Sequence, residues 1–261
     1  YPAAFAERIF HQIKGFGEYG FPESHSASFA LLAYASSWLK CYYPEVFVCA
    51  LLNSQPMGFY APGQLIYDAC RQGVEILPAD IRHSDKDSKL VKTSTGSSGE
   101  DRYSVRLGLR QIKGLSSKAM DRIPRLRHKL SSQDKLISIM DLRSHHFSQH
   151  DLQALAAANT LKETSGHRHQ AVWDAIKLNF EAGDDLLKNS YQREAPPLLR
   201  KPGVGEEVLK DYQSIGFSLQ SHPLAVLRES FQSLGWLHSS QCWQAHDGSY
   251  VACGGLVVGR Q

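Results

Sequence analysis

Hydrophobic residues recur with helical spacing over most of the chain. Residues 3–14 place Phe5, Ile9 and Ile13 on one stripe, which predicts an amphipathic helix ending at the glycines of GFGEYG. Residues 24–42 are apolar on nearly every side and predict a central, buried helix that Pro44 stops. Residues 44–54 and 61–73 predict two more helices, the second with Gly73 at its C-terminal cap.

The pattern then changes to one short strand and a hairpin. VEILP at 74–78 reads as a strand, and the alternating segments KLVKT and RYSVRL predict a β-hairpin over 89–107. Short helices follow to about residue 178. The chain is therefore expected to be mainly α with a small β-hairpin.

The last third begins with a polar, proline-containing stretch. Residues 181–203 predict a linker, residues 204–236 a helical segment, and SYVACGGLVVGRQ at 249–261 a first β-strand. A lone strand needs partners to be stable. The chain also lacks an initiating Met, so we expect it to be a piece of a longer protein that stops just inside another domain.

Composition excludes several classes of protein. Hydrophobic residues make up 42% and charged residues 21%, as in ordinary globular domains rather than disordered ones. No stretch is long and apolar enough to span a membrane, and the N-terminus has no signal peptide. Five scattered cysteines without a C-x-x-C pair favour a reducing cytosol. The twelve histidines lack zinc spacing, and we expect no metal site.

The positive charge is concentrated in one segment. Residues 101–135 hold ten Lys or Arg and three acidic residues, a net charge of +7 in a chain whose total is +3. Such an island is typical of a protein that binds a phosphate backbone. The alternative is a solvated helix face.

One segment of this island, LGLRQIKGLSSKAMDRI at 107–123, matches a helix-hairpin-helix. Backbone N–H groups of such a hairpin bind phosphates without reading sequence. The usual second glycine is Ser116, which tolerates a positive φ poorly. An ordinary helical hairpin with basic decoration is the alternative. The residues predicted to bind DNA are Lys113, Gly114, Leu115, Ser116, Lys118, Arg122 and Arg125, with Arg127 near them.

Residues 148–176 resemble a second, degenerate copy. Asn159 stands at the hairpin glycine position, and Asn is among the residues that best tolerate the left-handed conformation. The charge of this copy is nearly balanced, so we expect packing rather than DNA binding. His167, Arg168 and His169 are expected at the surface.

A polar cluster begins the helix at 24–42. Ser24, His25 and Ser26 crowd its first turn, and Phe29 lies one turn beyond His25. Helix N-termini favour phosphates, so the cluster could hold a nucleotide with Phe29 stacked on the base. The alternative is a capped helix start with Phe29 in the core.

Four separated motifs resemble the bacterial DNA polymerase III alpha subunit, a C-family polymerase. YGF-x-x-SHS-x-x-F-A and WLK-x-x-x-P-x-x-F, at 19–47, are similar to its fingers domain. LLNSQPMGFY at 51–60, Phe29 and GEEVLKDYQSIGFSLQSHPLAVLR at 205–228 are similar to the error-prone, damage-inducible branch. The resemblance covers essentially the whole chain.

The resemblance divides the chain into five parts. Residues 1–88 would be distal fingers with the nucleotide-pocket helix at 24–42, and residues 89–180 the hairpin and tandem helix-hairpin-helix. The linker (181–203), the helical segment (204–236) and a truncated OB-fold (237–261) complete the division.

The resemblance also implies an activity for the parent protein. It would add deoxynucleotides (dNTPs) to a primer–template opposite damaged DNA, with the sliding clamp and mutagenesis accessory proteins as further partners. The implied Mg²⁺ would be bound by palm aspartates outside this chain. Asp85 and Asp87 form the only D-x-D, in a loop that does not suit this role. The isolated chain is therefore predicted to be inactive. A stand-alone DNA-binding module without catalytic role is the competing interpretation.

Overall fold

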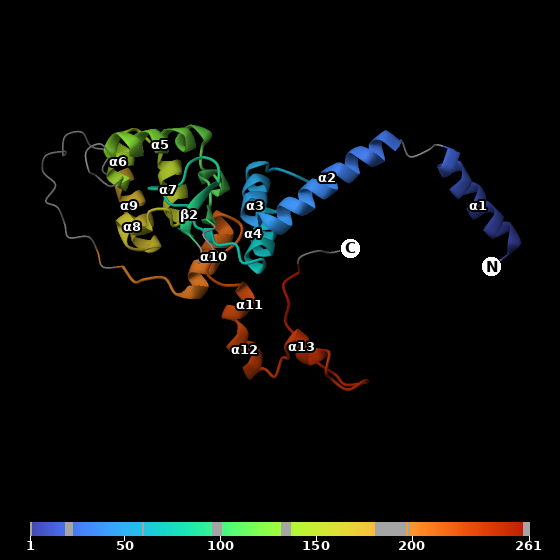
Figure 1. The fold of residues 1–261 in the computed structure, drawn as a ribbon. Helices are drawn as coiled ribbons and strands as arrows, with labels where there is room; N and C mark the ends of the chain where they lie inside the picture. Colours follow the sequence, from blue (N-terminus) through green and yellow to red (C-terminus); the bar gives the residue numbers. More distant parts are fainter. Residues whose placement is uncertain are drawn as a thin grey trace, which may run out of the picture.

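The fold is mainly helical with one small sheet, as predicted (Figure 1). The computed structural model describes residues 2–18, 23–58, 60–95, 101–131, 137–180, 197 and 199–257. In chain order the elements are α1 (Ala3–Glu18), α2 (Glu23–Tyr42), α3 (Pro44–Asn53), α4 (Pro62–Arg71), β1 (Ile76–Leu77), β2 (Lys89–Thr95), β3 (Asp101–Arg106), the 3₁₀ turn η1 (Leu109–Gln111), α5 (Ser117–Ser131), α6 (Ile139–Ser144), α7 (Gln149–Ala157), α8 (Lys162–Ser165), α9 (Arg168–Phe180), α10 (Val204–Ser214), α11 (Pro223–Val226), α12 (Arg228–Ser233) and α13 (Ser239–Cys242).

The three strands form a sheet in the order β1-β3-β2. β2 and β3 pair antiparallel with Leu90 opposite Val105, which confirms the hairpin predicted from the alternating pattern. β1 pairs parallel to β3 with Ile76 opposite Val105. Val105 is fully buried, so the sheet turns this side chain into the core.

Two hydrophobic clusters hold the fold together. The larger lies among the helices from η1 to α9, with Leu109, Ile123 and Leu152 fully buried. The smaller joins α3 and α4 to the sheet and to Phe217, which follows α10. Residues on both sides of the predicted boundary at residue 88 share this second cluster.

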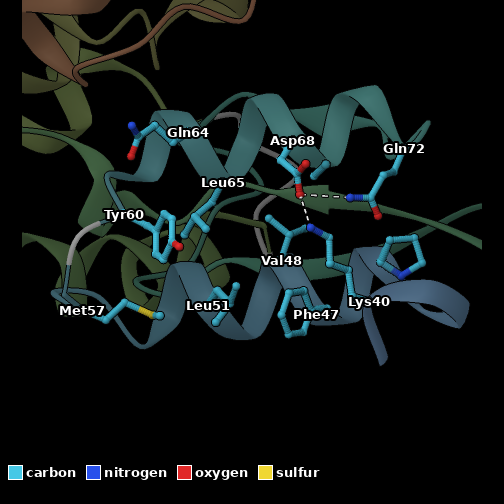
Figure 2. Close-up of a pocket in the computed structure, with 12 residues that line it drawn as sticks. Lys40, Phe47, Val48, Leu51, Met57, Tyr60, Gln64, Leu65, Asp68 and Gln72 are labelled. Atoms are coloured by element: carbon cyan, nitrogen blue, oxygen red, sulfur yellow. Dashed lines mark hydrogen bonds and ion pairs between the residues drawn. The ribbon is translucent and has the colours of Figure 1, made fainter. Parts of the chain in front are cut away.

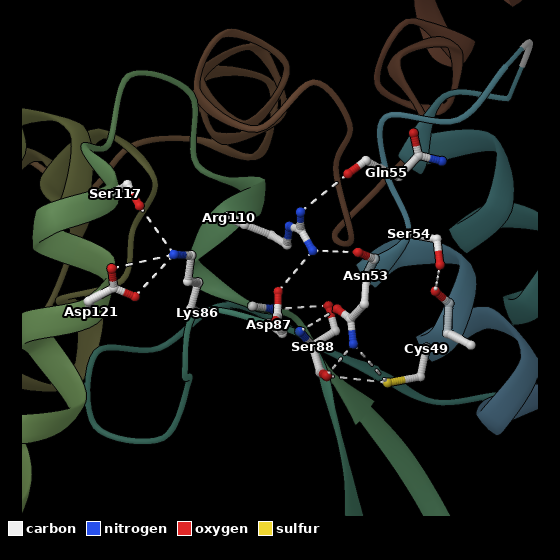
Figure 3. Close-up of polar contacts among 12 residues, drawn as sticks. Cys49, Asn53, Ser54, Gln55, Lys86, Asp87, Ser88, Arg110, Ser117 and Asp121 are labelled. Atoms are coloured by element: carbon white, nitrogen blue, oxygen red, sulfur yellow. Dashed lines mark hydrogen bonds and ion pairs between the residues drawn. The ribbon is translucent and has the colours of Figure 1, made fainter.

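A polar junction fastens α3 to the start of β2 (Figure 3). The Asn53 amide donates to the Ser88 carbonyl at 2.8 Å, and the Ser88 N–H donates back to Asn53 Oδ1 at 2.7 Å. Arg110 donates to the Asn53 and Gln55 carbonyls and pairs with Asp87 at 2.8 Å. Gly108 is required beside this junction, because a Cβ there would lie 2.4 Å from the Asp87 carbonyl carbon.

The helix at 24–42 was predicted to be buried, and this prediction is wrong. Figure 1 shows α2 projecting from the body, with only its C-terminal end beside α3. Phe29, Leu31 and Tyr34 are each more than half exposed. A helix that is apolar on every side needs cover on every side, and the described residues cover only one end. Across the described residues, no helix has the length and apolar content needed to cross a membrane.

Other predicted boundaries also moved. α1 continues through Gly15 and Gly17 to Glu18 instead of ending at these glycines. The strand expected over 249–261 is reduced, within the described residues, to one bridge between Cys253 and Leu237. A single segment without a neighbouring ladder cannot propagate a strand. Most of the predicted linker, and residues 258–261, lie outside the described residues.

Candidate nucleic-acid interface

The first hairpin links η1 to α5 through residues 112–116. Ile112 and Leu115 are buried and anchor the turn in the larger cluster. Gly114 has φ +79°, and a Cβ there would lie 3.2 Å from the His150 ring. The backbone conformation therefore favours glycine, and a Cβ would also push the His150 ring by a few tenths of an ångström.

Ser116 caps α5. Its hydroxyl accepts from the Ala119 N–H at 3.2 Å, which satisfies a free donor of the first helical turn. Its φ is not in the positive range, so a serine fits the second glycine position without strain. The Ser116 N–H and hydroxyl donate to Asp151, at 2.9 Å to Oδ1 and 3.1 Å to Oδ2.

Asp151 belongs to the first turn of α7 and is buried beneath the hairpin. Its N–H donates to Ser148 Oγ at 3.1 Å, and the Ser148 hydroxyl donates to its carboxylate at 2.6 Å. Burial alone would raise the pKa of Asp151, but the hydrogen bonds from Ser148 and Ser116 outweigh it and hold this pKa below its usual value. The carboxylate therefore stays charged beside the hairpin.

Lys113 is tied to α10. Its N–H donates to the Ser214 carbonyl at 2.8 Å, and its amine donates to the Tyr212 carbonyl at 2.9 Å. The carbonyls at a helix C-terminus lack internal partners and carry partial negative charge, so a lysine stabilises them. The side chain is still exposed and can also face a ligand.

Much of the basic island is bound within the protein. Arg122 lies 4.4 Å over the Phe147 ring and donates to the His145 and His146 carbonyls. Five side chains of the island donate to backbone carbonyls: Arg106, Arg110, Lys113, Arg122 and Arg127. In the part of the chain that the structure describes, Arg102, Lys118 and Arg125 are exposed and have no side-chain partner.

The second copy has the predicted left-handed turn, but its Arg168 is not exposed as predicted. Asn159 has φ +58°, which confirms the left-handed position expected from its sequence. Arg168 was expected at the surface and is instead 2% exposed. It pairs with Glu207 at 2.9 Å and with Asp211, two residues of α10. Those carboxylates lie about forty residues away in sequence, so local pattern could not reveal them.

The predicted nucleotide cluster lies on α2, away from the hairpins. Ser24 and His25 are in the first turn of α2, and their side chains lie outside the described part of the structure. Ser26 and Phe29 are exposed, Phe29 by 57%. In Figure 1 α2 points away from α5, so the two predicted sites are separate.

Sequence analysis missed a pocket between α3 and α4 (Figure 2). It has a volume of about 560 Å³ and is lined mainly by apolar side chains, including Phe47, Leu51 and Leu65. The ion pair between Lys40 and Asp68, 2.7 Å long, lies at its edge. Facing apolar positions on the two helices were the signal, and they also fit ordinary core packing.

The described residues do not fit a Mg²⁺ site. Asp85 is bound by Lys89 and Arg127, and Asp87 by Arg110, so both carboxylates already have cations. No group of three His, Cys, Asp or Glu gathers among the residues that the structure describes. The metal implied for the polymerase family therefore has no ligand set here.

Comparison with known proteins gives this geometry a context. A family model for the helix-hairpin-helix motif matches residues 73–171. The chain is 47% identical to an error-prone DNA polymerase of Methylococcus capsulatus, over 100% of this chain and 26% of that protein. It is 46% identical to one of Alkalilimnicola ehrlichii, over 98% of this chain and 24% of the relative. A third, of Teredinibacter turnerae, is 44% identical over 100% of this chain and 24% of the relative.

The matches extend over both the hairpins and the flanking segments. The chain spans about a quarter of the length of these bacterial relatives. It is thus homologous to a region of the error-prone DNA polymerases that carries a helix-hairpin-helix motif.

Proposed function

We propose that this chain is the DNA-holding and nucleotide-lining region of an error-prone, damage-inducible DNA polymerase. The observation that carries the proposal is 47% identity over the whole chain, beyond the 73–171 segment that any helix-hairpin-helix protein could share. In this proposal the parent enzyme performs translesion synthesis with dNTPs on a primer–template. Its palm aspartates and their Mg²⁺ lie elsewhere in the protein.

Duplex binding is assigned to the first hairpin and α5. The support is the set of exposed cations at the hairpin and along α5, which are suited to sequence-independent contact with phosphates. The second copy supports the first by packing, because its one buried arginine is already paired. The sliding clamp and mutagenesis accessory proteins remain partners of the parent enzyme in this proposal.

The test of duplex binding is a salt series with the whole chain and a short duplex of mixed sequence. Each phosphate neutralised contributes about −0.9 to the slope of log K against log salt. Affinity should fall steeply with salt and depend little on sequence. Affinity that does not change with salt would contradict a DNA-holding role.

The nucleotide-lining role is assigned to Ser24, His25, Ser26 and Phe29. Phe29 is 57% exposed, so part of its ring is accessible to a base, as stacking requires. In a full-length polymerase carrying this region, Phe29→Ala should weaken incoming-nucleotide use about ten- to hundredfold, the loss of one stacking contact worth about 1–3 kcal/mol. DNA affinity should change little.

Tyr34→Ala is the matched control for this experiment, because Tyr34 is another exposed aromatic residue of α2. It should leave nucleotide kinetics unchanged. Equal effects of the two substitutions would assign Phe29 a general role in helix packing. A parent gene that encodes no palm domain upstream of this region would instead leave the stand-alone module as the better interpretation.

A further inference from the structure

Most of the backbone N–H groups of the first hairpin donate hydrogen bonds to other groups of the same chain. The Lys113 N–H donates to Ser214, the Leu115 N–H to Ile112 at 3.4 Å and the Ser116 N–H to Asp151 at 2.9 Å. A phosphate at Ser116 would have to replace a buried carboxylate that already accepts three hydrogen bonds. Asp151 thus occupies the position where a hairpin would hold a phosphate oxygen.

The outer face of α5 offers a different surface. Ala119, Ile123, Leu126 and Leu130 are buried on one stripe of the helix. A second stripe, spaced by three and four residues, is exposed and basic: Lys118, Arg122, Arg125 and Lys129. Figure 1 shows α5 along the outer edge of the helical body.

Two side chains of this stripe are not paired with an acidic or carbonyl group of the described residues, so their charges can face a DNA backbone. The side chains of Lys118 and Arg125 make no ion pair or hydrogen bond among the described residues, whereas the Arg122 side chain donates to the His145 and His146 carbonyls. Asp121 is the one acidic residue of α5, and it pairs with Lys86 at 3.1 Å. Figure 3 shows Lys86 also reaching Ser117, at 3.1 Å. Asp121 therefore does not neutralise the stripe.

We propose that the DNA backbone is held by the outer face of α5, through Lys118 and Arg125, and that Asp151 closes the hairpin to phosphate at Ser116. Seven residues separate these cations, about 10.5 Å along a helix, which equals the rise of about three base pairs along the duplex axis. The inference rests on the proposed function, because it says which atoms perform the DNA binding assigned above.

The first test removes the two cations from the whole chain. Lys118→Gln with Arg125→Gln should flatten the salt slope by about 1.8, or two phosphates. Lys162→Gln with Lys210→Gln is the matched control, since it removes two exposed cations of α8 and α10. The control should leave the slope near that of the wild type. Equal flattening by both pairs would overturn the assignment to α5.

The second test removes the internal anion. Asp151→Asn should raise the affinity for duplex DNA, because it removes the negative charge that repels a phosphate from the Ser116 N–H. Asp141→Asn is the matched control: Asp141 is 6% exposed, as Asp151 is, and follows its capping Ser138 by three residues, as Asp151 follows Ser148. It should leave the affinity unchanged. An unchanged affinity of folded Asp151→Asn would contradict the proposal that Asp151 keeps phosphate from the hairpin.

A measurement without substitution covers the case in which Asp151→Asn does not fold. In an amide NMR titration of the wild-type chain with duplex DNA, the Ser116 amide should keep its chemical shift while resonances of α5 around Lys118 move. A large shift of the Ser116 amide would show phosphate binding at the hairpin and contradict the proposal. Binding that weakens with salt but ignores the α5 substitutions refutes this inference alone, whereas salt-independent binding refutes the proposed function itself.

Discussion

Asp85 lies between two cations that come from different parts of the chain. Lys89 donates to Oδ2 at 2.6 Å from the start of β2, and Arg127 donates to Oδ1 from α5. Arg127 also donates to the Ser84 carbonyl at 2.8 Å, so it fixes the loop that carries Asp85. A residue that resembled half of a metal-binding D-x-D is therefore a structural contact between the sheet and α5.

This contact should make stability depend on pH. Burial would raise the pKa of Asp85, but the hydrogen bonds from Lys89 and Arg127 outweigh it and hold this pKa below the ordinary value of 3.8. A pKa lowered by folding contributes stability that is present above the unfolded value and lost as pH falls through the folded value. The free energy of unfolding should thus decrease as the pH falls below 3.8, the ordinary pKa of this carboxyl.

Urea unfolding of the wild type and Asp85→Asn over a pH series would measure this contribution. The wild type should be more stable than the variant near neutral pH, and the gap should narrow as pH falls below the ordinary carboxyl value. The pKa of Asp151 is also lowered. Because both proteins contain Asp151, it contributes the same loss of stability at low pH to each and does not change the gap between them. A gap that widens toward low pH would contradict the role given to Asp85.

Among the elements, α10 connects the two hairpins. Lys113 of the first hairpin caps its C-terminal carbonyls, and Arg168, at the start of α9, pairs with Glu207 and Asp211. The Ser218 hydroxyl donates to Asp211 at 2.7 Å and completes the network. The helix that follows the predicted linker is therefore packed into the hairpin region rather than standing apart from it.

The buried network of α10 predicts a large effect from one substitution. Arg168→Met should destabilise the fold by about 3–5 kcal/mol, because it leaves two largely buried carboxylates without a cation. Adding Glu207→Gln and Asp211→Asn should recover much of the loss, since no uncompensated charge then remains. Thermal and urea unfolding of the three proteins measure both effects. If Arg168→Met alone were as stable as the wild type, the ion pairs of Arg168 with Glu207 and Asp211 would not be important for stability.

At the scale of the whole molecule, the two assigned functions occupy different ends. The hairpins and α5 belong to the body, and α2 projects from it with an exposed apolar surface (Figure 1). Large exposed apolar surfaces mark places where other protein surfaces or ligands bind. The described residues include the proposed DNA contacts, and they contain no group of three ligands that could hold the metal ions of a polymerase.

The isolated chain should therefore bind duplex DNA without extending a primer. We expect salt-dependent binding, and no product with Mg²⁺ and all four dNTPs in a primer-extension assay. A full-length error-prone polymerase assayed in parallel controls for the substrate and buffer. Template-dependent extension by the highly purified chain would contradict this prediction and require a catalytic carboxylate site within the chain.

The sequence by itself determined what short-range forces control. Helical periodicity located most helices, alternation located the β2–β3 hairpin, and the positive φ of Gly73 and Asn159 agrees with their residue types. Side-chain size and backbone strain act within a few residues, so local pattern can report them. Motif similarity located the homologous region for the same reason, because it reads residue order and not contacts.

Only the tertiary structure decided where the charges act. The Lys113 amine reaches a carbonyl 99 residues away, Arg168 is buried by carboxylates 39 and 43 residues away, and Ser116 meets Asp151 across 35 residues. The exposure of α2 depends in the same way on which surfaces lie beside it. Electrostatic and packing energies depend on distance in space and on burial, which the order of residues does not specify. A count of basic residues therefore indicated a candidate DNA-binding region, while their contacts separated the cations that hold the fold from Lys118 and Arg125, which we propose to hold DNA.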